Sequence, residues 1–483
     1  MDKKTADDRP PTADPRGPRK DATTPRRNGL LATLRLGVVA LIPHFRRERG
    51  VTWSVVCGLS SVLIALVILI AARPVASQPE RPAAVASGGG EYALPDADHI
   101  TGAERGEIEA MLATNTARLR AEGRLPASRA AERVSLGWPL RGRGGFADPG
   151  FHAVTGFVDH AAGYPNQLLD YACGGRTYDS YSGYNHQGTD FYLWPFAWNK
   201  MAAGDVEVVA AAPGVIIGRT DGNPDQSCTF NSNRWNAVYV RHADGSVAWY
   251  GHLKRGSVTS KAVGATVAAG EYLGAVGSSG NSTGPHLHFE LYDAGQLVDP
   301  YAGSCNALPG GSWWASQRNY YDSGINRLAT GTAAVSWGSC PNPDTPNEAT
   351  QFQPGDRITF SAYYRDQVEG KPSLYRIVTP DGAIYAQWSH SVARPHYTLS
   401  YWWWAFDFPA DVQSGPWRFE VEFNDATYSH TFYVGSPSTP TPTATPGSSP
   451  DLTPTPTASP TRSPYDRQAF LPLLLGATGG RDK

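Results

Sequence analysis

The chain has 483 residues, enough for two or three domains, and its formal net charge is −2. Nucleic-acid-binding domains are usually strongly basic, so this near-neutral balance argues against nucleic acid as a partner. The 51 Gly and 39 Pro residues gather in linkers and in segments rich in turn signals. This distribution favours mainly β domains joined by extended connections.

An apolar segment near the N-terminus predicts a membrane anchor. Residues 1–50 are rich in Pro and basic residues and are expected to be a disordered cytoplasmic tail. The next segment, Val51–Ala72, has no charged residue, and as a helix it would be roughly 33 Å long, enough to span a hydrocarbon core of about 30 Å. Arginines just before it place the N-terminus in the cytoplasm, which predicts a single-pass protein of the cell membrane with residues 73 onward on the extracytoplasmic side. A signal peptide cleaved near Val75–Ser77, giving a secreted product, is the alternative.

Residues 73–135 are predicted to be a linker with one short helix. Thr101 and Glu104 have the spacing of a capping box at a helix N-terminus. The apolar residues that follow at helical spacing are expected to pack on the next domain or to form a stalk. These residues are Ile108, Met111, Leu112 and Leu119, and the pattern ends at Gly123 and Pro126.

Short β-type segments begin near Trp138. Gly, Asn and Asp turn signals separate them, and no long helical period occurs before Tyr301, so an antiparallel β domain is predicted over residues 136–305. The predicted strands include Val206–Ala212, Val215–Gly218, Ala237–His242, Val247–Gly251, Tyr272–Val276 and His286–Leu291.

A second β domain is predicted over residues 348–435, after an irregular connector of residues 306–347. Six short strands in fewer than about a hundred residues are typical of a β-sandwich. Within Tyr401–Trp404, strand alternation puts Trp402 and Trp404 on one face and Trp403 on the other. These indoles are predicted either to pack in the core and on a neighbouring domain, or to contact the cell wall or its sugars. Residues 436–483 are predicted to be a Pro/Thr-rich spacer and a C-terminal tag.

Four cysteines lie in the part of the chain predicted outside the cytoplasm. None has the C-x-x-C spacing of a zinc knuckle or a redox motif, so disulfides are expected. Four cysteines allow three pairings, and the simplest is predicted, namely Cys173–Cys228 with Cys305–Cys340.

Three short motifs carry the candidate chemistry. A strand beginning at His286 would place His286 and His288 on one face, while the intervening and following apolar residues enter a core. About a hundred residues upstream, His186 and Asp190 are four apart and share one face of an extended segment. His252 lies between these motifs. Zinc accepts imidazole nitrogen and carboxylate oxygen, and a catalytic zinc needs three protein ligands and one open position. The sequence therefore offers a metal site with ligands to spare.

The order H-x-x-x-D, a lone His before Leu, and H-x-H resembles the lysostaphin-like zinc endopeptidases that cut peptidoglycan peptides. The resemblance extends from about Trp138 to Tyr301 and implies an antiparallel β-sheet peptidase fold of the lysostaphin type. One connection, Leu193–Asp205, is longer than the family usually has, and it is predicted to be either a loop over the cleft or a surface loop packed by its own aromatics. The resemblance also implies that Zn²⁺ is bound by His186, Asp190 and His288 and that the catalytic pair is His252 and His286.

The expected chemistry agrees with these roles. Two imidazoles and one carboxylate leave zinc with net positive charge and an open position, which can lower the pKa of a bound water to about 7. The sequence has no H-E-x-x-H glutamate, so the protons are assigned to His252 and His286. Glu290 is predicted to be either a support behind His288 or a peripheral carboxylate. The expected function is that of a zinc-dependent metalloendopeptidase acting on peptide cross-links of bacterial peptidoglycan. The alternative is a catalytically inactive relative that binds the wall or regulates another hydrolase. The bond that is cut, glycine–glycine or one involving a D-amino acid, stays open.

Overall fold

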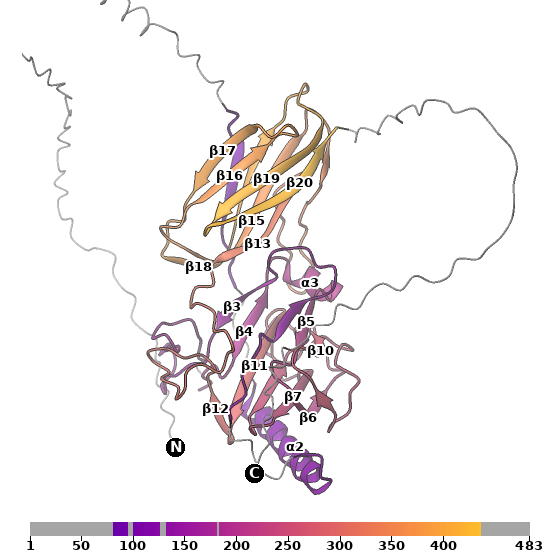
Figure 1. The fold of residues 1–483 in the computed structure, drawn as a ribbon, viewed down its shortest axis with the longest axis vertical. Coiled ribbons are helices and arrows are strands. Elements are labelled where there is room, and N and C mark those ends of the chain that lie inside the picture. Colours follow the sequence, from indigo (N-terminus) through magenta and orange to yellow (C-terminus); the bar gives the residue numbers. More distant parts are fainter. Residues whose placement is uncertain (1–80, 95–99, 126–131, 181–182, 436–483) are drawn as a thin grey trace, which may run out of the picture. The chain divides into compact units, whose positions relative to one another are not determined.

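The computed structural model describes residues 81–94, 100–125, 132–180 and 183–435. The predicted tail, the predicted anchor Val51–Ala72 and the predicted spacer of residues 436–483 lie outside these ranges. None of the helices within the described ranges is both long and apolar enough to cross a membrane. The described residues are mainly β, as predicted, and their strands form four sheets (Figure 1).

The largest sheet is antiparallel and has the order β3-β4-β11-β8-β7-β6-β9, with β12 paired to β11. A three-stranded sheet of order β10-β5-β2 accompanies it. These sheets account for the strands predicted between residues 206 and 291. The strands of the largest sheet are β3 (His152–Gly156), β4 (Thr189–Leu193), β6 (Gly214–Thr220), β7 (Ala237–His242), β8 (Val247–Gly251), β9 (Thr266–Val267), β11 (His286–Asp293) and β12 (Gln296–Val298). Those of the smaller sheet are β2 (Leu140–Gly142), β5 (Val206–Val209) and β10 (Tyr272–Ala275).

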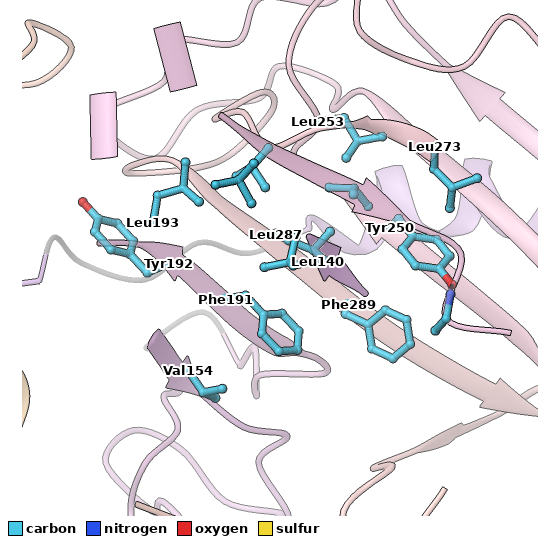
Figure 2. Packing of buried hydrophobic residues seen from close by; sticks show 14 of the residues in the cluster. Leu140, Val154, Phe191, Tyr192, Leu193, Tyr250, Leu253, Leu273, Leu287 and Phe289 are labelled. Carbon is cyan, nitrogen blue, oxygen red and sulfur yellow. Dashed lines mark hydrogen bonds between the residues drawn. The ribbon is translucent and has the colours of Figure 1, made fainter. Parts of the chain in front are cut away.

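Strand β11 is central because its two faces have different tasks. Leu287, Phe289 and Leu291 are fully buried in the main hydrophobic core, as the alternation predicted. Figure 2 shows Leu287 and Phe289 near Phe191 of β4 and Tyr250 of β8. Burial of each such side chain contributes about 1.5–3 kcal/mol relative to exposure. The packing of this face holds β11 in register and leaves the opposite face to His286 and His288.

The predicted helix is confirmed as α2 (Gly102–Ala121). Thr101 is the N-cap, and its Oγ1 accepts a hydrogen bond of 3.1 Å from the Glu104 backbone N–H. The Glu104 carboxylate does not complete a reciprocal capping box in the described structure, because it accepts from the backbone N–H of Trp235 at 3.2 Å. The apolar residues of α2 pack on the largest sheet. Of the two predicted alternatives, packing on the next domain is therefore observed and a free stalk is not. The hydrophobic cluster contains Ile108, Leu112, Leu119, Ile217, Tyr239 and Trp249.

The C-terminal strands form two sheets of a sandwich, of order β1-β18-β15-β13 and β14-β20-β19-β16-β17. Aromatic side chains such as Phe360, Tyr375, Trp404 and Trp417 fill the space between the sheets. The strands of the first sheet are β1 (Ala86–Glu91), β13 (Gly324–Gly331), β15 (Arg357–Val368) and β18 (His396–Asp407). Those of the second are β14 (Gln351–Phe352), β16 (Ser373–Val378), β17 (Ile384–His390), β19 (Gly415–Phe423) and β20 (Ala426–Val434).

Two strands of the sandwich come from segments predicted to lack regular structure. β13 lies in the predicted irregular connector, and a register shift between Ile325 and Arg327 breaks the alternation that would have marked it as a strand. β1 lies in the predicted linker and contains three consecutive glycines, which have low strand propensity. They pair with β18, and the absence of a side chain at Gly88 leaves room for its register partner, since a β-carbon there would lie 2.8 Å from the Trp403 ring. The edge strand thus covers Trp403, while Trp404 belongs to the sandwich core.

The segment Leu193–Asp205 is neither a loop over the cleft nor a loop packed only by its own aromatics. It contains a short helix, α3 (Ala197–Ala203), and Trp194, Phe196 and Trp198 are buried in the main core. The Trp194 ring stacks on that of Trp337, and its Nε1–H donates to the backbone carbonyl of Tyr364 at 2.9 Å. The extra length of this connection therefore serves packing against β15.

The cysteines form two disulfides, but the predicted pairing is wrong. The bonds join Cys173 to Cys305 and Cys228 to Cys340. Cys305 reaches Cys173 because its backbone N–H donates to the carbonyl of Tyr171 at 2.9 Å. The two bonds close loops with sequence separations of 132 and 112, rather than the short loops assumed from neighbours in the sequence.

Candidate metal centre and catalytic site

The register of three strands brings the sequence motifs together. β11 pairs antiparallel with β4 on one side and with β8 on the other. His288 lies opposite Asp190 of β4 and opposite Gly251 of β8. Side chains that share one face of a paired position have β-carbons about 5 Å apart. Hydrogen-bond register alone therefore places the carboxylate of Asp190 beside the imidazole of His288.

The first cluster consists of His186, Asp190 and His288, all buried. His186 Nε2 lies 3.2 Å from Asp190 Oδ2, His288 Nδ1 lies 2.8 Å from Asp190 Oδ1, and the two ring nitrogens are 3.4 Å apart. A tetrahedral zinc with ligands at about 2.0–2.1 Å separates neighbouring ligand atoms by roughly 3.3 Å. The donor atoms thus have the chemistry and the spacing of a zinc site.

The hydrogen bonds behind this cluster orient the two imidazoles. His186 Nδ1 lies 2.6 Å from the carbonyl oxygen of Phe157, and His288 Nε2 lies 2.9 Å from Glu290 Oε1. These oxygens only accept, so each of these nitrogens carries the proton of the neutral ring. The lone pairs of His186 Nε2 and His288 Nδ1 then face Asp190. Such a support is typical of metal-ligating histidines.

The second cluster consists of His252, His286 and His288. The rings of His252 and His286 are 4.6 Å apart, and His286 Nε2 lies 3.8 Å from Asp190 Oδ1. Nδ1 of His252 contacts the carbonyl oxygen of Ser279 at 2.5 Å, and Nδ1 of His286 contacts that of Gly284 at 2.7 Å. Nε2 of each neutral ring is therefore left unprotonated. All five residues predicted for the site are thus brought together.

Two residues that support the site were not predicted. Tyr178 stacks on the ring of His186 at 4.1 Å, and its hydroxyl donates to Asp190 Oδ2 at 2.8 Å. Arg105 of α2 forms a double hydrogen bond with the carboxylate of Glu290. Neither residue belongs to a recognisable motif, and no sequence spacing connects them to the histidines.

Glu290 lies behind His288, so the first of its two predicted placements is observed. Its side chain is fully buried. Burial by itself raises the pKa of Glu290. The charge and hydrogen bonds of Arg105 lower this pKa by more than burial raises it, so the pKa lies well below its usual range. The carboxylate is therefore ionised near neutral pH and accepts the His288 hydrogen bond as an anion.

An antiparallel sheet that holds a buried His/Asp ligand set beside two further imidazoles has the chemistry of a metal-assisted hydrolase. Residues 184–300, which contain all five residues, match the sequence model of Peptidase family M23. Arg105, Tyr178 and the sandwich lie outside the matched residues.

Known proteins resemble parts of the chain. The DD-carboxypeptidase/endopeptidase Mpg of Neisseria meningitidis is 52% identical over 65 residues, 14% of this chain and 14% of that protein. The peptidoglycan DD-endopeptidase ShyC of Vibrio cholerae is 34% identical over 115 residues, 24% of this chain and 22% of that protein. The catalytic domain of lysostaphin from Staphylococcus simulans is 25% identical, with a TM-score of 0.19, over 30% of this chain and 85% of that one. The chain thus matches less than a quarter of the length of Mpg and of ShyC.

Proposed function

We propose that the protein is a zinc-dependent endopeptidase that hydrolyses peptide cross-links of bacterial peptidoglycan. The observation that carries the proposal is the spacing of the donor atoms of His186, Asp190 and His288, at 2.8–3.4 Å from one another, beside two further imidazoles. One relative is named as a peptidoglycan DD-endopeptidase and another as a DD-carboxypeptidase/endopeptidase, and these names support the substrate class.

His186, Asp190 and His288 would hold the zinc ion. A zinc ion bound there would supply a Lewis acid for the scissile carbonyl and would lower the pKa of water. The alternative ligand set, His252, His286 and His288, uses the same His288. The lone pair of His288 Nδ1 faces Asp190 at 2.8 Å, which favours the set that contains the carboxylate.

His252 and His286 are then left to move protons. Their Nδ1 atoms are held by backbone carbonyls, so Nε2 of each ring can accept a proton from the attacking water and return it to the leaving amine. His252 has a φ of 58°, in the left-handed region that costs most residues energy, and this turn of the backbone presents its ring beside His286.

The second candidate is an inactive relative that binds the wall or regulates another hydrolase. Loss of a ligand or of a proton carrier is the expected route to such a protein. All five positions are occupied here by groups able to do the chemistry, which favours the enzyme.

The placement of the protein is part of the proposal. Val51–Ala72 would anchor the chain in the cell membrane with the peptidase outside the cytoplasm. The two disulfides support an oxidising compartment for the described residues. The domain assignment belongs to the same proposal. The peptidase comprises residues 136–305, and the sandwich comprises residues 348–435 together with β1 and β13. Contact of the sandwich with wall sugars stays a prediction.

The test is digestion of purified peptidoglycan by the purified protein, with mass analysis of the released fragments. We expect new amino termini within the cross-links, loss of activity with a chelator and recovery with zinc. Fragments that show only sugar-bond cleavage, or none, would contradict the proposal. His252→Ala, purified in the same way, controls for a contaminating hydrolase.

A further inference from the structure

We propose that Arg105 is a positioning residue for His288 and acts on it through Glu290. The proposal rests on the proposed function in one respect, namely that His288 is a metal ligand. Arg105 belongs to α2 (Gly102–Ala121), which precedes residues 184–300, the part of the chain that matches the peptidase family. The metal centre would therefore depend on a helix outside that domain match.

The hydrogen bonds form a continuous chain from the helix to the imidazole. Arg105 donates from NH1 to Glu290 Oε2 and from NH2 to Glu290 Oε1, both at 2.8 Å. Glu290 Oε1 is also the atom that His288 Nε2 contacts at 2.9 Å. The same oxygen thus receives the guanidinium and the imidazole. The Tyr292 hydroxyl donates to the other oxygen at 2.6 Å and fixes the carboxylate plane.

These hydrogen bonds matter because the groups that form them are buried. The side chains of Glu290 and His288 are 0% exposed and that of Arg105 is 14% exposed. A buried carboxylate is costly unless it is paired, and a planar guanidinium pairs with both oxygens at once. Because the two hydrogen bonds from Arg105 hold the carboxylate in one orientation, its Oε1 stays placed as an acceptor for the proton on His288 Nε2. Nδ1 then keeps its lone pair directed at the metal position.

The helix is held in place independently of the ion pair. Ile108, Leu112 and Leu119 pack on the largest sheet, and Glu104 accepts from the Trp235 backbone at 3.2 Å. The Arg105 guanidinium also lies over the Trp249 ring at 5.4 Å. Trp249 is the register partner of Glu290 on β8. The guanidinium therefore reaches Glu290 from a fixed position, as a positioning role requires.

The experiment measures zinc affinity in the full chain by competition with a chelator, together with the visible spectrum of the Co²⁺-substituted protein. We expect Arg105→Ala to weaken zinc binding by about 10–100-fold, the usual effect of losing a group behind a metal ligand, and to change the Co²⁺ spectrum. Arg105→Lys should recover part of the affinity because it keeps the charge but not the double hydrogen bond. The matched control is Arg118→Ala on the same helix, whose partner is the exposed Glu122, and it should leave both readouts unchanged.

Arg105→Ala leaves an unpaired buried carboxylate and can unfold the protein for that reason alone. The double variant Arg105→Met/Glu290→Gln removes both charges and keeps a carbonyl acceptor for His288. We expect it to fold and still to bind zinc more weakly than wild type, because the guanidinium no longer holds the group at position 290 against His288. If wild type binds zinc and the double variant matches it in affinity and in Co²⁺ spectrum, Arg105 has only a structural role and the inference is overturned. A wild-type protein that binds no zinc would overturn the proposed function as well.

Discussion

Gly188 lies so close to His288 that any side chain at position 188 would displace the imidazole ring or the backbone next to it. A β-carbon added to Gly188 would lie 2.6 Å from Nε2 of the His288 ring and 2.9 Å from the carbonyl oxygen of Phe289. Nε2 is the atom that donates to Glu290, so an added methyl group would push the ring away from the position in which it makes this hydrogen bond. The glycine between His186 and Asp190 therefore leaves room for the His288 ring in the candidate metal centre.

We predict that Gly188→Ala weakens zinc binding by about tenfold or more, because His288 must turn away from Glu290. The measurement is zinc affinity by chelator competition on folded protein. Gly106→Ala on α2 is the control, since an added β-carbon there meets no atom within 4 Å. It should be neutral or stabilise the helix by up to about 1 kcal/mol. Wild-type zinc affinity in Gly188→Ala would contradict this account of the contact.

The disulfide pairing gives a second prediction. Peptide mapping of the unreduced protein should find Cys173 linked to Cys305 and Cys228 linked to Cys340. Because the two loops have similar sequence separations, 132 and 112, the chain-entropy model predicts similar losses when either bond is removed, about 5 kcal/mol at most. Urea unfolding of the two paired Cys→Ser variants measures this. Free thiols at these positions, or the sequence-neighbour pairing, would refute it.

The third prediction concerns the pH dependence of stability that comes from Lys200, a buried residue of α3. Its Nζ donates to the carbonyl of Pro195 at 2.7 Å and lies 3.8 Å from Asp148 Oδ2. Burial lowers the pKa of Lys200 to about 8, although Asp148 opposes the shift. Between about pH 8 and 10.5 the unfolded chain binds more protons at this residue than the folded one, so the free energy of unfolding rises with pH there.

Lys200→Met isolates this effect. At pH 7 the variant should be more stable than wild type, because it does not bury a charge. The difference should shrink by about 3 kcal/mol as the pH rises to 10.5, since the pKa falls from 10.5 to about 8 on folding and one pH unit corresponds to about 1.4 kcal/mol. Urea unfolding of both proteins at pH 7 and pH 10.5 is the measurement. A stability difference that does not change with pH would rule out the depressed pKa.

Much of the fold follows from local patterns in the sequence. β7 and β8 have the predicted bounds because alternation and flanking turn residues mark both ends. The five candidate site residues could be named because strand periodicity puts His286 and His288 on one face and because the order of the motifs resembles a known family. The structure brings the five residues together, and their roles stay predictions. β1 was not predicted, since its glycines have low strand propensity. The reason for a glycine at position 88 is the nearby Trp403 ring on β18, which is visible only in the structure.

What the sequence lacks is information on which distant segments meet. The disulfide pairing depends on the contact of Cys305 with Tyr171, which no spacing encodes. Arg105 likewise looks like an ordinary polar residue on an amphipathic helix. Its role follows from the packing of that helix over β8 and β11, a tertiary relationship that becomes visible only in the structure.

The most direct test of the central claim is to measure bound zinc beside peptidoglycan cleavage in four single variants. We predict about one zinc per chain in wild type, and loss of both zinc and cleavage in Asp190→Ala and His288→Ala. His252→Ala and His286→Ala should keep the zinc and lose turnover by on the order of a hundredfold or more, because each removes a proton carrier and not a ligand. A wild-type protein without zinc would contradict the enzyme assignment, and a loaded His288→Ala beside an empty His286→Ala would show that the roles along β11 are reversed.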